Sequence, residues 1–312
     1  MSFASHSDVI LKSKISTFLN SCDKRFAYPF GLRPHMGFGA DYMGLLSRLM
    51  SCLECGIKFS LCKIRSPQGF SVANGWSDYF EPFFDEVDSP LMGLLNRHEF
   101  PYQRIFPLTK TLARAWLRNY TQPQTTFFAF DKLPQLCNAN HASLFDLDLD
   151  WVQARGVIMK LLWKLNVQTQ NEVSRSITSA RIPERFYAMH IRRGDKKKEF
   201  ALVPIEKYVI TVNNLPEKHL PLFVASDDFL VVDHLRRALP RREIISFAAP
   251  SAQGHDNAKF NMLPLEKRRM LTVALFADLE CLRRAQLFVG TQTSNIGWMI
   301  NSFREGEGIV WT

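Results

Sequence analysis

The last third of the chain alternates between two hydrophobic patterns. Short apolar runs predict buried strands at 186–191, 222–225, 243–247, 287–290 and 309–311. Between these runs, apolar residues recur at helical spacing, which predicts helices at 204–213, 228–238, 263–284 and 294–303. Strand and helix in alternation are typical of a parallel, doubly wound sheet, whose ligands bind beyond the carboxyl ends of the strands. We therefore look for chemistry in the loops that follow the strands.

The first part of the chain has a less regular pattern. Apolar residues at helical spacing predict a helix over 41–54, and the run after it predicts a strand over 57–64. Asp150 is a suitable cap for a helix over 151–165, and a further helix is expected to run to residue 180. The intervening segment 66–130, rich in Phe, Pro and Trp, is expected to be irregular, with a short helix near 108–116. We expect two domains, 1–180 and 181–312.

Composition and charge narrow the class of protein. Hydrophobic residues make up 46% and charged residues 22% of the 312 residues, which is ordinary for a globular protein. The formal charge is +9, and it is densest in 181–200, where seven basic residues (Arg181, Arg185, Arg192, Arg193, Lys196, Lys197, Lys198) face three acidic ones (Glu184, Asp195, Glu199). Basic excess favours an anionic partner such as a phosphorylated small molecule, a membrane surface or nucleic acid. The 25 Phe lie mostly in apolar stretches, so a core role outweighs stacking on nucleic acid, and we expect no nucleic-acid partner.

The cysteines and the absence of long apolar runs bear on disulfide bonds, metal binding and location. Six cysteines are few for a disulfide-stabilised fold of this size, and Cys52, Cys55 and Cys62, the only close group, are expected to be free thiols. A zinc site would need a second Cys/His pair at a suitable spacing, and none is present. No run of about 18 apolar residues and no signal-peptide pattern occurs, so a soluble, cytoplasmic location is expected.

The first strand of the last third ends in a charged loop, residues 190–196. Side chains alternate along a strand, so His190 and Arg192 should share one face and Arg193 the other. A guanidinium at a strand end suits bidentate binding of phosphate, and Arg193 is placed to pair with Asp195 and brace the loop. The alternative interpretation is a solvated charged loop.

Polar residues also follow the other strands. Asp227 and Asp228 either cap the next helix or contact a ligand or the first loop. Thr293 and Ser294 precede a helix, where amides and hydroxyls favour phosphate, although capping alone would also explain them. Asp278 lies in an apolar stretch of the long helix and is either exposed or paired.

One acidic cluster is a candidate metal site. Asp146, Asp148 and Asp150 alternate with leucine, and three carboxylates at this spacing are able to hold Mg²⁺ or Mn²⁺. They also precede a predicted helix, where acidic residues cap and complement the helix dipole. We favour capping and expect no metal.

Taken together, the loops resemble the α-1,6-fucosyltransferase family, which includes core fucosyltransferases and rhizobial chitin-oligosaccharide fucosyltransferases. Residues 190–196 (His-Ile-Arg-Arg-Gly-Asp-Lys) match the family's H-V-R-R-x-D-K signature, and residues 199–208 match its E-x-x-x-x-P-I-E-x-Y. Residues 223–228 resemble its strand ending in two aspartates, and residues 278–294 resemble its D-x-x-x-L-x-x-A-D-F-L-V-x-T-x-S-S block. Upstream, residues 37–39 (Gly-Phe-Gly) and 74–76 (Asn-Gly-Trp) resemble family loops.

The resemblance implies an α/β fold of two Rossmann-like domains, in the B-type glycosyltransferase architecture, with GDP in the C-terminal domain. It implies the following roles: guanine contacts for His190 and Asp278; β-phosphate contacts for Arg192 and Ser294; further nucleotide-sugar contacts for Gly37, Gly39 and Thr293; general base for Glu199, with Lys196 beside it at the acceptor hydroxyl; and support of the acceptor or the loop for Arg193, Asp195, Tyr208, Asp227 and Asp228. With Arg192 and a helix N-terminus available for the diphosphate, neither a metal nor a cofactor is expected.

The expected function is inverting, metal-independent transfer of fucose from GDP-fucose to a hydroxyl of a glycan. The alternatives are the same fold with another GDP-sugar, a protein O-fucosyltransferase, and a nucleotide- or glycan-binding module without activity, against which the retention of Arg192, Lys196 and Glu199 argues. The loop before Glu199 is one residue shorter than in the vertebrate-type family, so the base assignment rests on the spacing to Pro204. The family's cysteines are replaced and its flanking segments are absent here, which fits a reducing compartment or a trimmed form of an enzyme of the Golgi lumen.

Overall fold

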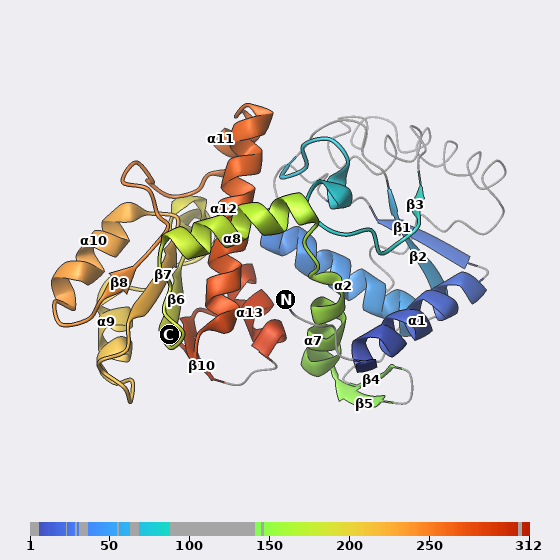
Figure 1. Cartoon of the computed structure of the whole chain (residues 1–312), viewed down its shortest axis with the longest axis horizontal. Coiled ribbons are helices and arrows are strands. Elements are labelled where there is room, and N and C mark those ends of the chain that lie inside the picture. Colours follow the sequence, from blue (N-terminus) through green and yellow to red (C-terminus); the bar gives the residue numbers. More distant parts are fainter. Residues whose placement is uncertain are drawn as a thin grey trace. The chain divides into compact units, whose positions relative to one another are not determined.

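The computed structural model describes residues 6–22, 24–28, 30, 37–54, 56–62, 69–87, 141–144, 147–304 and 308–312. The chain forms two compact units (Figure 1). The N-terminal unit comprises Met1–Arg33 and Asp41–Lys164, and the C-terminal unit comprises Pro34–Ala40 and Leu165–Thr312. None of the helices in the described ranges is long and apolar enough to cross a lipid bilayer.

The C-terminal unit is built on a five-stranded parallel sheet. Its strands are β6 (Tyr187–Ile191), β7 (Leu222–Ser226), β8 (Ile244–Ile245), β9 (Leu287–Gly290) and β10 (Ile309–Trp311), in the spatial order β10-β9-β6-β7-β8. Numbered from β6, this order reads 3-2-1-4-5 from the other edge, the strand order of a nucleotide-binding Rossmann fold. The direction of winding reverses at β6, so the loops after β6 and β9 leave the sheet in opposite directions.

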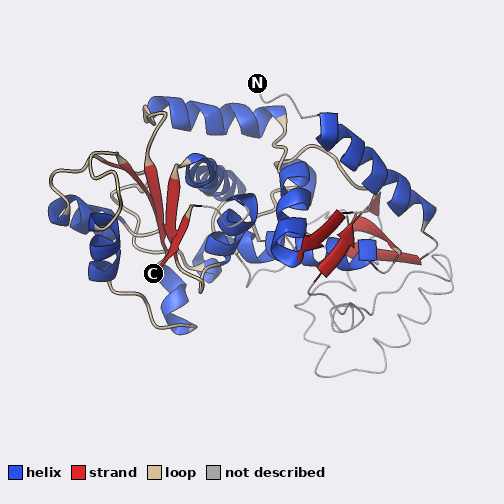
Figure 2. Ribbon diagram, turned by 90° about the horizontal axis from the view of Figure 1, so that it is seen from below, coloured by secondary structure: helices blue, strands red, loops and turns tan. Residues whose placement is uncertain are grey.

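Helices cover both faces of this sheet (Figure 2). Helices α9 (Ile205–Asn213) and α10 (Phe229–Ala238) pack on one face. Helix α12 (Leu265–Arg284) packs against β6 and β7, and α8 (Val167–Ser179) and α13 (Asn295–Arg304) pack against α12. The odd-numbered residues of β6 belong to the core under α9 and α10. By strand alternation, His190 therefore points to the side of α12. All five residues of β6 are buried, as expected for a central parallel strand.

The N-terminal unit also contains a parallel sheet. Its strands are β1 (Lys24–Tyr28), β2 (Ile57–Cys62) and β3 (Glu86–Val87), in the order β1-β2-β3. Helix α2 (Phe38–Glu54) connects β1 to β2, and α1 (His6–Ser21) precedes them. An antiparallel hairpin, β4 (His141–Leu144) and β5 (Leu147–Asp150), leads into α7 (Trp151–Leu162).

The loop at Asn74–Trp76, which resembles a family loop, has a structural role in this unit. It forms the one-turn helix η1 (Gly75–Asp78), and the Asp78 carboxylate accepts hydrogen bonds from the backbone amides of residues 72–75 at 2.8–3.2 Å. The Trp76 ring stacks on Phe80 with the ring centroids 4.3 Å apart, and Phe30 and Tyr42 pack around it. The aromatic residues of 69–87 therefore build a core, as their composition predicted.

The α/β class is confirmed, with a parallel sheet in each unit. In the last third, each expected element has an observed counterpart, but the strand expected at 243–247 is confined to Ile244–Ile245. Helix α11 (Asn257–Asn261) was not expected. Helix α8 belongs to the C-terminal unit, where it packs on α12. The expected domains 1–180 and 181–312 stay a prediction. A Rossmann-like N-terminal domain stays a prediction. The helix expected near 108–116 lies outside the described residues.

Candidate active site

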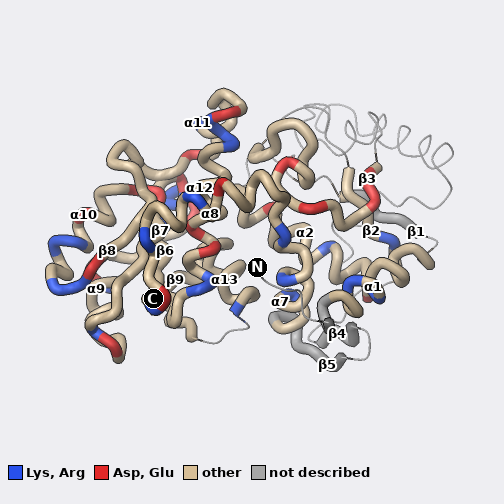
Figure 3. The backbone as a smooth tube through the Cα atoms, in the orientation of Figure 1, with Lys and Arg blue, Asp and Glu red and all other residues tan. Residues whose placement is uncertain are grey.

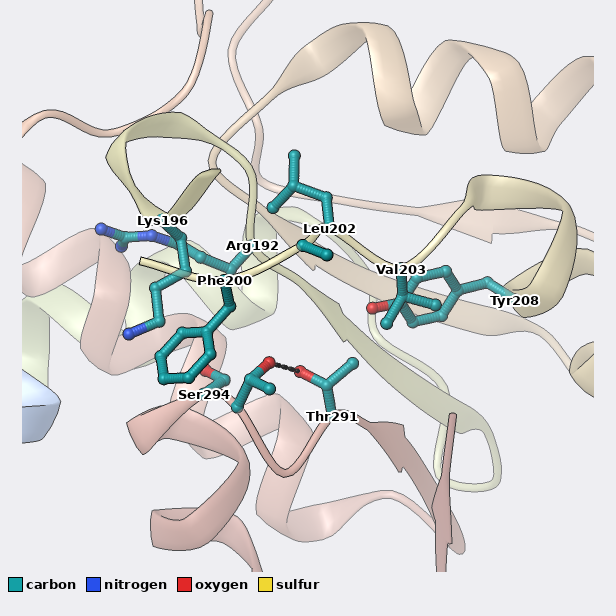
Figure 4. A pocket seen from close by; sticks show the side chains of 10 residues that line it. Arg192, Lys196, Phe200, Leu202, Val203, Tyr208, Thr291 and Ser294 are labelled. Atoms are coloured by element: carbon teal, nitrogen blue, oxygen red, sulfur yellow. Dashed lines mark hydrogen bonds between the residues drawn. The ribbon is translucent and has the colours of Figure 1, made fainter. Parts of the chain in front are cut away.

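A pocket lies at the carboxyl end of the C-terminal sheet, beside the strands where the winding reverses. Its lining comes from three segments (Figure 4): the loop after β6 with Arg192 and Lys196, the stretch 200–208, and the loop after β9. The ten lining residues are Arg192, Lys196, Phe200, Ala201, Leu202, Val203, Tyr208, Thr291, Thr293 and Ser294. Ligands of doubly wound sheets bind at this position, because the diverging loops leave a crevice.

Five of these residues were named from the sequence: Arg192, Lys196, Tyr208, Thr293 and Ser294. Sequence reasoning missed Thr291 and the run 200–203. Thr291 follows strand β9 in the same loop as Ser294, so it could have been predicted from the rule that ligands bind beyond the carboxyl ends of the strands. The run 200–203 carries no charged or hydrogen-bonding side chain, and its position in the pocket follows only from the fold.

Arg192 lies between two carboxylates. Its Nη2 donates to Asp195 Oδ1 at 2.7 Å, and its Nε lies 3.3 Å from Asp227 Oδ2. The side chain is 26% exposed, so part of the guanidinium remains open to the pocket. This fixed orientation suits the binding of an anion in the crevice, since a guanidinium offers five donors in a rigid plane.

The two carboxylates also fasten a second loop, residues 253–257, over the first. Asp227 Oδ1 accepts from the Arg193 amide at 2.7 Å, and its Oδ2 accepts from the His255 amide at 2.9 Å. Asp195 Oδ2 accepts from the Asn257 amide at 3.0 Å, and the Asp195 amide donates to the His255 carbonyl at 2.9 Å. Burial alone would raise the pKa of Asp195, but the Asn257 amide and Arg192 outweigh it and hold that pKa below its ordinary value.

The expected pairing of Arg193 with Asp195 is wrong. Arg192 takes that carboxylate, and Arg193 instead donates from Nη1 to the carbonyl of Val203 at 2.8 Å. The loop turns sharply at Gly194 (φ +35°), and this turn carries Asp195 back toward Arg192. The capping interpretation of Asp228 is confirmed, because its Oδ1 accepts from the Leu230 amide at the start of α10.

Lys196 and Glu199 form an ion pair at the rim of the pocket. The short helix η2 (Gly194–Lys198) places Lys196 Nζ 2.5 Å from Glu199 Oε2 and 4.9 Å from the centre of the Phe200 ring. The Glu199 side chain is 56% exposed, whereas the Lys196 side chain is 16% exposed. A carboxylate held beside the pocket and open to solvent is accessible to a hydroxyl group that approaches from outside.

His190 and Ser294 lie behind the pocket. Both are buried, and Ser294 Oγ is 3.5 Å from His190 Nδ1. Burial, reinforced by the positive charge of Arg192, lowers the pKa of His190 to about 3. The imidazole is therefore neutral at physiological pH and carries one donor and one acceptor nitrogen.

Asp278 departs from the simpler expectation that it is exposed. It lies in α12, the helix that packs against β6, and its Oδ1 is buried with no hydrogen-bond partner among the described residues. Burial raises the pKa of Asp278 well above its ordinary value. A buried carboxyl oxygen without a partner is costly, and such groups commonly mark a binding site.

Gly37 and Gly39, at the start of α2, reach the same region. A Cβ on Gly39 would lie 3.0 Å from the Ile296 side chain and 3.4 Å from that of Asn295, so glycine permits close approach to the start of α13. A Cβ on Gly37 would lie 3.8 Å from Asn257 Oδ1. Both glycines thus lie near the loops that surround the pocket.

Tyr208 is part of both the core and the pocket. It is buried, and burial raises its pKa, an effect partly offset by hydrogen bonds with Thr312 and Thr291 and by the charge of Arg193. Thr293 Oγ1 donates to Thr291 Oγ1 at 3.3 Å. Tyr208, Thr291 and Thr293 therefore contribute three hydroxyl-bearing side chains to the lining of the pocket.

No group of three His, Cys, Asp or Glu side chains gathers in a metal-binding arrangement within the described part of the chain. Asp146 lies outside the described residues, while Asp148 and Asp150 belong to strand β5 and their side chains are not described. Metal independence therefore stays a prediction.

Basic and acidic residues are interspersed along both units (Figure 3).

Comparison with known proteins identifies the fold. No protein-family model and no curated protein sequence matches the chain. Among solved structures, the chain resembles a NodZ α-1,6-fucosyltransferase soaked with GDP-fucose (TM-score 0.51, 15% identity, 90% of this chain and 93% of that one). It also resembles fucosyltransferase NodZ from Bradyrhizobium (TM-score 0.52, 16% identity, 89% of this chain and 92% of that one). A further similar structure is a variant of Arabidopsis thaliana FUT1 in complex with GDP (TM-score 0.53, 12% identity, 96% of this chain and 78% of that one).

The class that the fold defines is an α/β protein with parallel sheets, like B-type glycosyltransferases. The resemblance to the α-1,6-fucosyltransferase family is confirmed as a likeness of fold. At these identities the likeness carries no residue roles, and the roles must come from the geometry.

Proposed function

We propose that the chain is an inverting, metal-independent glycosyltransferase that moves fucose from GDP-fucose to a hydroxyl of a glycan. One observation supports this most: Arg192, Lys196, Ser294 and Thr293 converge on one pocket at the point of the sheet where nucleotides bind. The fold likeness to fucosyltransferases, some of them in complex with GDP or GDP-fucose, supports the choice of donor.

The nucleotide end of the donor is assigned to the side of α12. His190, neutral because it is buried, and Asp278 Oδ1, which has no hydrogen-bond partner among the described residues, offer hydrogen-bonding groups to the guanine edge. A base buried against these groups would satisfy the Asp278 oxygen, which otherwise costs free energy. The binding of GDP would thus remove a penalty that the folded protein carries.

The diphosphate is assigned to Arg192, Ser294 and the N-terminus of α13. As the bond between the sugar carbon and the β-phosphate oxygen breaks, negative charge grows on that oxygen. A guanidinium, a hydroxyl and the amides at a helix N-terminus stabilise this charge without a metal ion. Asp195 and Asp227 are positioning residues, because each holds Arg192 and the 253–257 loop at once.

Glu199 is assigned as the general base. The acceptor hydroxyl attacks the anomeric carbon from the face opposite the diphosphate, and this attack inverts the configuration. The proton of the hydroxyl passes to the Glu199 carboxylate. The Lys196 ammonium pairs with this carboxylate and is itself assigned a place near the acceptor oxygen. Lys196 thus lies close to both the base and the pocket.

The test combines donor binding with transfer. Calorimetry with GDP and GDP-fucose would establish the donor, and release of GDP would then be measured with N-glycans, chitin oligosaccharides and folded protein domains as acceptors. Transfer to a glycan that persists in EDTA, with an inverted anomeric centre by NMR, is the expected result. Failure to bind either nucleotide at millimolar concentration contradicts the proposal, whereas restoration by Mn²⁺ after EDTA would contradict metal independence.

A further inference from the structure

Two side chains of the 253–257 loop are hydrogen-bonded to each other. His255 Nε2 lies 2.8 Å from Asn257 Oδ1. Asp256, between them, has an extended backbone (φ −129°, ψ 118°), and in an extended segment residues two apart point to the same side. The Asp256 carboxylate instead accepts hydrogen bonds from the amides of residues 258 and 259 in α11. The local backbone therefore brings the imidazole and the amide of Asn257 together.

The imidazole of His255 is neutral at physiological pH. Burial lowers its pKa and the positive charge of Arg192 lowers it further, against smaller opposing effects of the Asn257 hydrogen bond and of the Asp195 and Asp227 carboxylates. A neutral imidazole has one N–H group and an amide oxygen only accepts, so His255 donates from Nε2 to Asn257 Oδ1. Because the imidazole is uncharged, it leaves both carboxylates to Arg192.

The backbone amides of this pair hold the two carboxylates that orient Arg192. Asp195 Oδ2 accepts from the Asn257 amide at 3.0 Å, and Asp195 Oδ1 accepts from Arg192 Nη2 at 2.7 Å. The His255 amide donates to Asp227 Oδ2 at 2.9 Å, and this oxygen lies 3.3 Å from Arg192 Nε. A displacement of residues 255–257 therefore reaches the guanidinium through both carboxylates.

The loop needs a restraint beyond its backbone contacts because it contains a glycine with an unusual conformation. Gly254 has φ +89°, and glycine loses more conformational freedom on folding than any other residue. The hydrogen bond between His255 and Asn257 limits this freedom directly after Gly254. Other parts of the C-terminal unit enclose the pair: the Phe260 ring centre lies 5.4 Å from that of the imidazole, and a Cβ on Gly37 would lie 3.8 Å from Asn257 Oδ1.

We propose that His255 and Asn257 are positioning residues of the donor site: their hydrogen bond fixes the 253–257 loop and so holds Arg192 in the orientation that binds the β-phosphate. This inference rests on the proposed function and adds two residues that act through Arg192. In Figure 4, Arg192 lies at the same end of the pocket as Ser294, to which the diphosphate is also assigned. Loss of the pair should weaken the binding of the β-phosphate and leave the binding of the rest of the nucleotide unchanged.

Calorimetry with GDP and GMP provides the direct test, since GMP has no β-phosphate. Asn257→Leu and His255→Leu each remove the hydrogen bond without changing the charge. We expect each to bind GDP about three- to tenfold more weakly, the effect of one hydrogen bond, and to bind GMP within about twofold of the wild type. His255→Gln keeps an N–H donor near the position of Nε2, so it should bind GDP within about twofold of the wild type. The His255 variants decide the matter if Asn257→Leu does not fold.

A double-mutant cycle tests whether the pair acts through Arg192. In an Arg192→Lys background the guanidinium that the pair orients is gone, so adding Asn257→Leu should weaken GDP binding by less than about twofold. A purely structural role would give the same loss in both backgrounds. Asn214→Leu is the matched control, because Asn214 is exposed at the end of α9 and should bind both nucleotides like the wild type when substituted.

Three results would overturn the inference while the proposed function stands. The first is unchanged GDP affinity in both leucine variants of the pair. The second is an equal loss of affinity for GDP and GMP, and the third is an equal loss with and without Arg192→Lys. Lack of GDP binding by the wild type would instead overturn the proposed function, and this inference with it.

Discussion

Replacing Gly194 with alanine tests whether the loop after β6 and the 253–257 loop must touch for the donor site to form. A Cβ at this position would lie 2.1 Å from the His255 carbonyl oxygen and 2.5 Å from the His255 nitrogen. Real Cβ contacts are essentially never shorter than 3.0 Å, and both atoms belong to the backbone. The two loops would therefore have to separate by about 1 Å.

This separation breaks specific hydrogen bonds. The bonds from the Asp195 amide to the His255 carbonyl and from the His255 amide to Asp227 are both 2.9 Å long, and an extra ångström removes them. Each contributes about 0.5–1.5 kcal/mol net, and the positive φ of +35° costs a residue with a Cβ about 1–2 kcal/mol more. The variant should lose about 2–5 kcal/mol of unfolding free energy.

The assay pairs urea unfolding with calorimetry of GDP binding, and Gly56→Ala is the control. Gly56 has φ +62° and nothing within 4 Å of its added Cβ, so it isolates the backbone cost without a clash. Gly194→Ala should unfold at lower urea concentration than Gly56→Ala and bind GDP at least about tenfold more weakly, since Arg192 loses its fixed orientation. If Gly194→Ala binds GDP like the wild type and is no less stable than Gly56→Ala, the coupling of the two loops is refuted.

Three further substitutions test single groups. Arg192→Lys keeps the charge but not the two-donor plane, so GDP binding should weaken by about 1–3 kcal/mol, while the exposed control Arg185→Lys should bind normally. Glu199→Gln should lower turnover on a working acceptor by about 10²–10⁴-fold with GDP affinity nearly intact, and unchanged turnover would move the base to another carboxylate. His190→Gln should flatten the loss of stability as pH falls from 6.5 to about 3, because over that range the unfolded histidine binds a proton and the folded one does not. An equal pH slope in wild type and variant would contradict the burial of a neutral imidazole.

The regular part of the fold could be predicted because both faces of its sheet are buried. Strands such as β6 and β9 then read as continuous apolar runs, and the helices between them carry one apolar face each. The strand-end rule led to His190, Arg192 and Ser294 because a parallel sheet gathers its carboxyl ends at one edge. These residues could be predicted from the order of strands and helices alone.

Other features depend on contacts that the local pattern does not contain. Residues 146–150 alternate aspartate with leucine, the period of a strand, and most of this run forms strand β5, yet the acidic residues drew attention to capping and metal binding. The opening helix α1 was missed because its apolar face is weak. For Asp278 the local pattern left exposure and pairing both open, and the structure buries its Oδ1 without a hydrogen-bond partner in the described part of the chain.

The 253–257 loop is the clearest case of a site component that sequence alone did not identify. Its polar, glycine-containing stretch has no helical or strand period, and its backbone amides, not its side chains, make the contacts to Asp227 and Asp195. Gly254 has φ +89°, and a Cβ there would lie 2.6 Å from the Cα of Gly194. Glycine is therefore required on both sides of one contact, at two places 60 residues apart. The Arg-Arg-Gly-Asp run after β6 has a glycine at its third position because another backbone passes against it, and the aspartates that hold this backbone are the same two that orient Arg192.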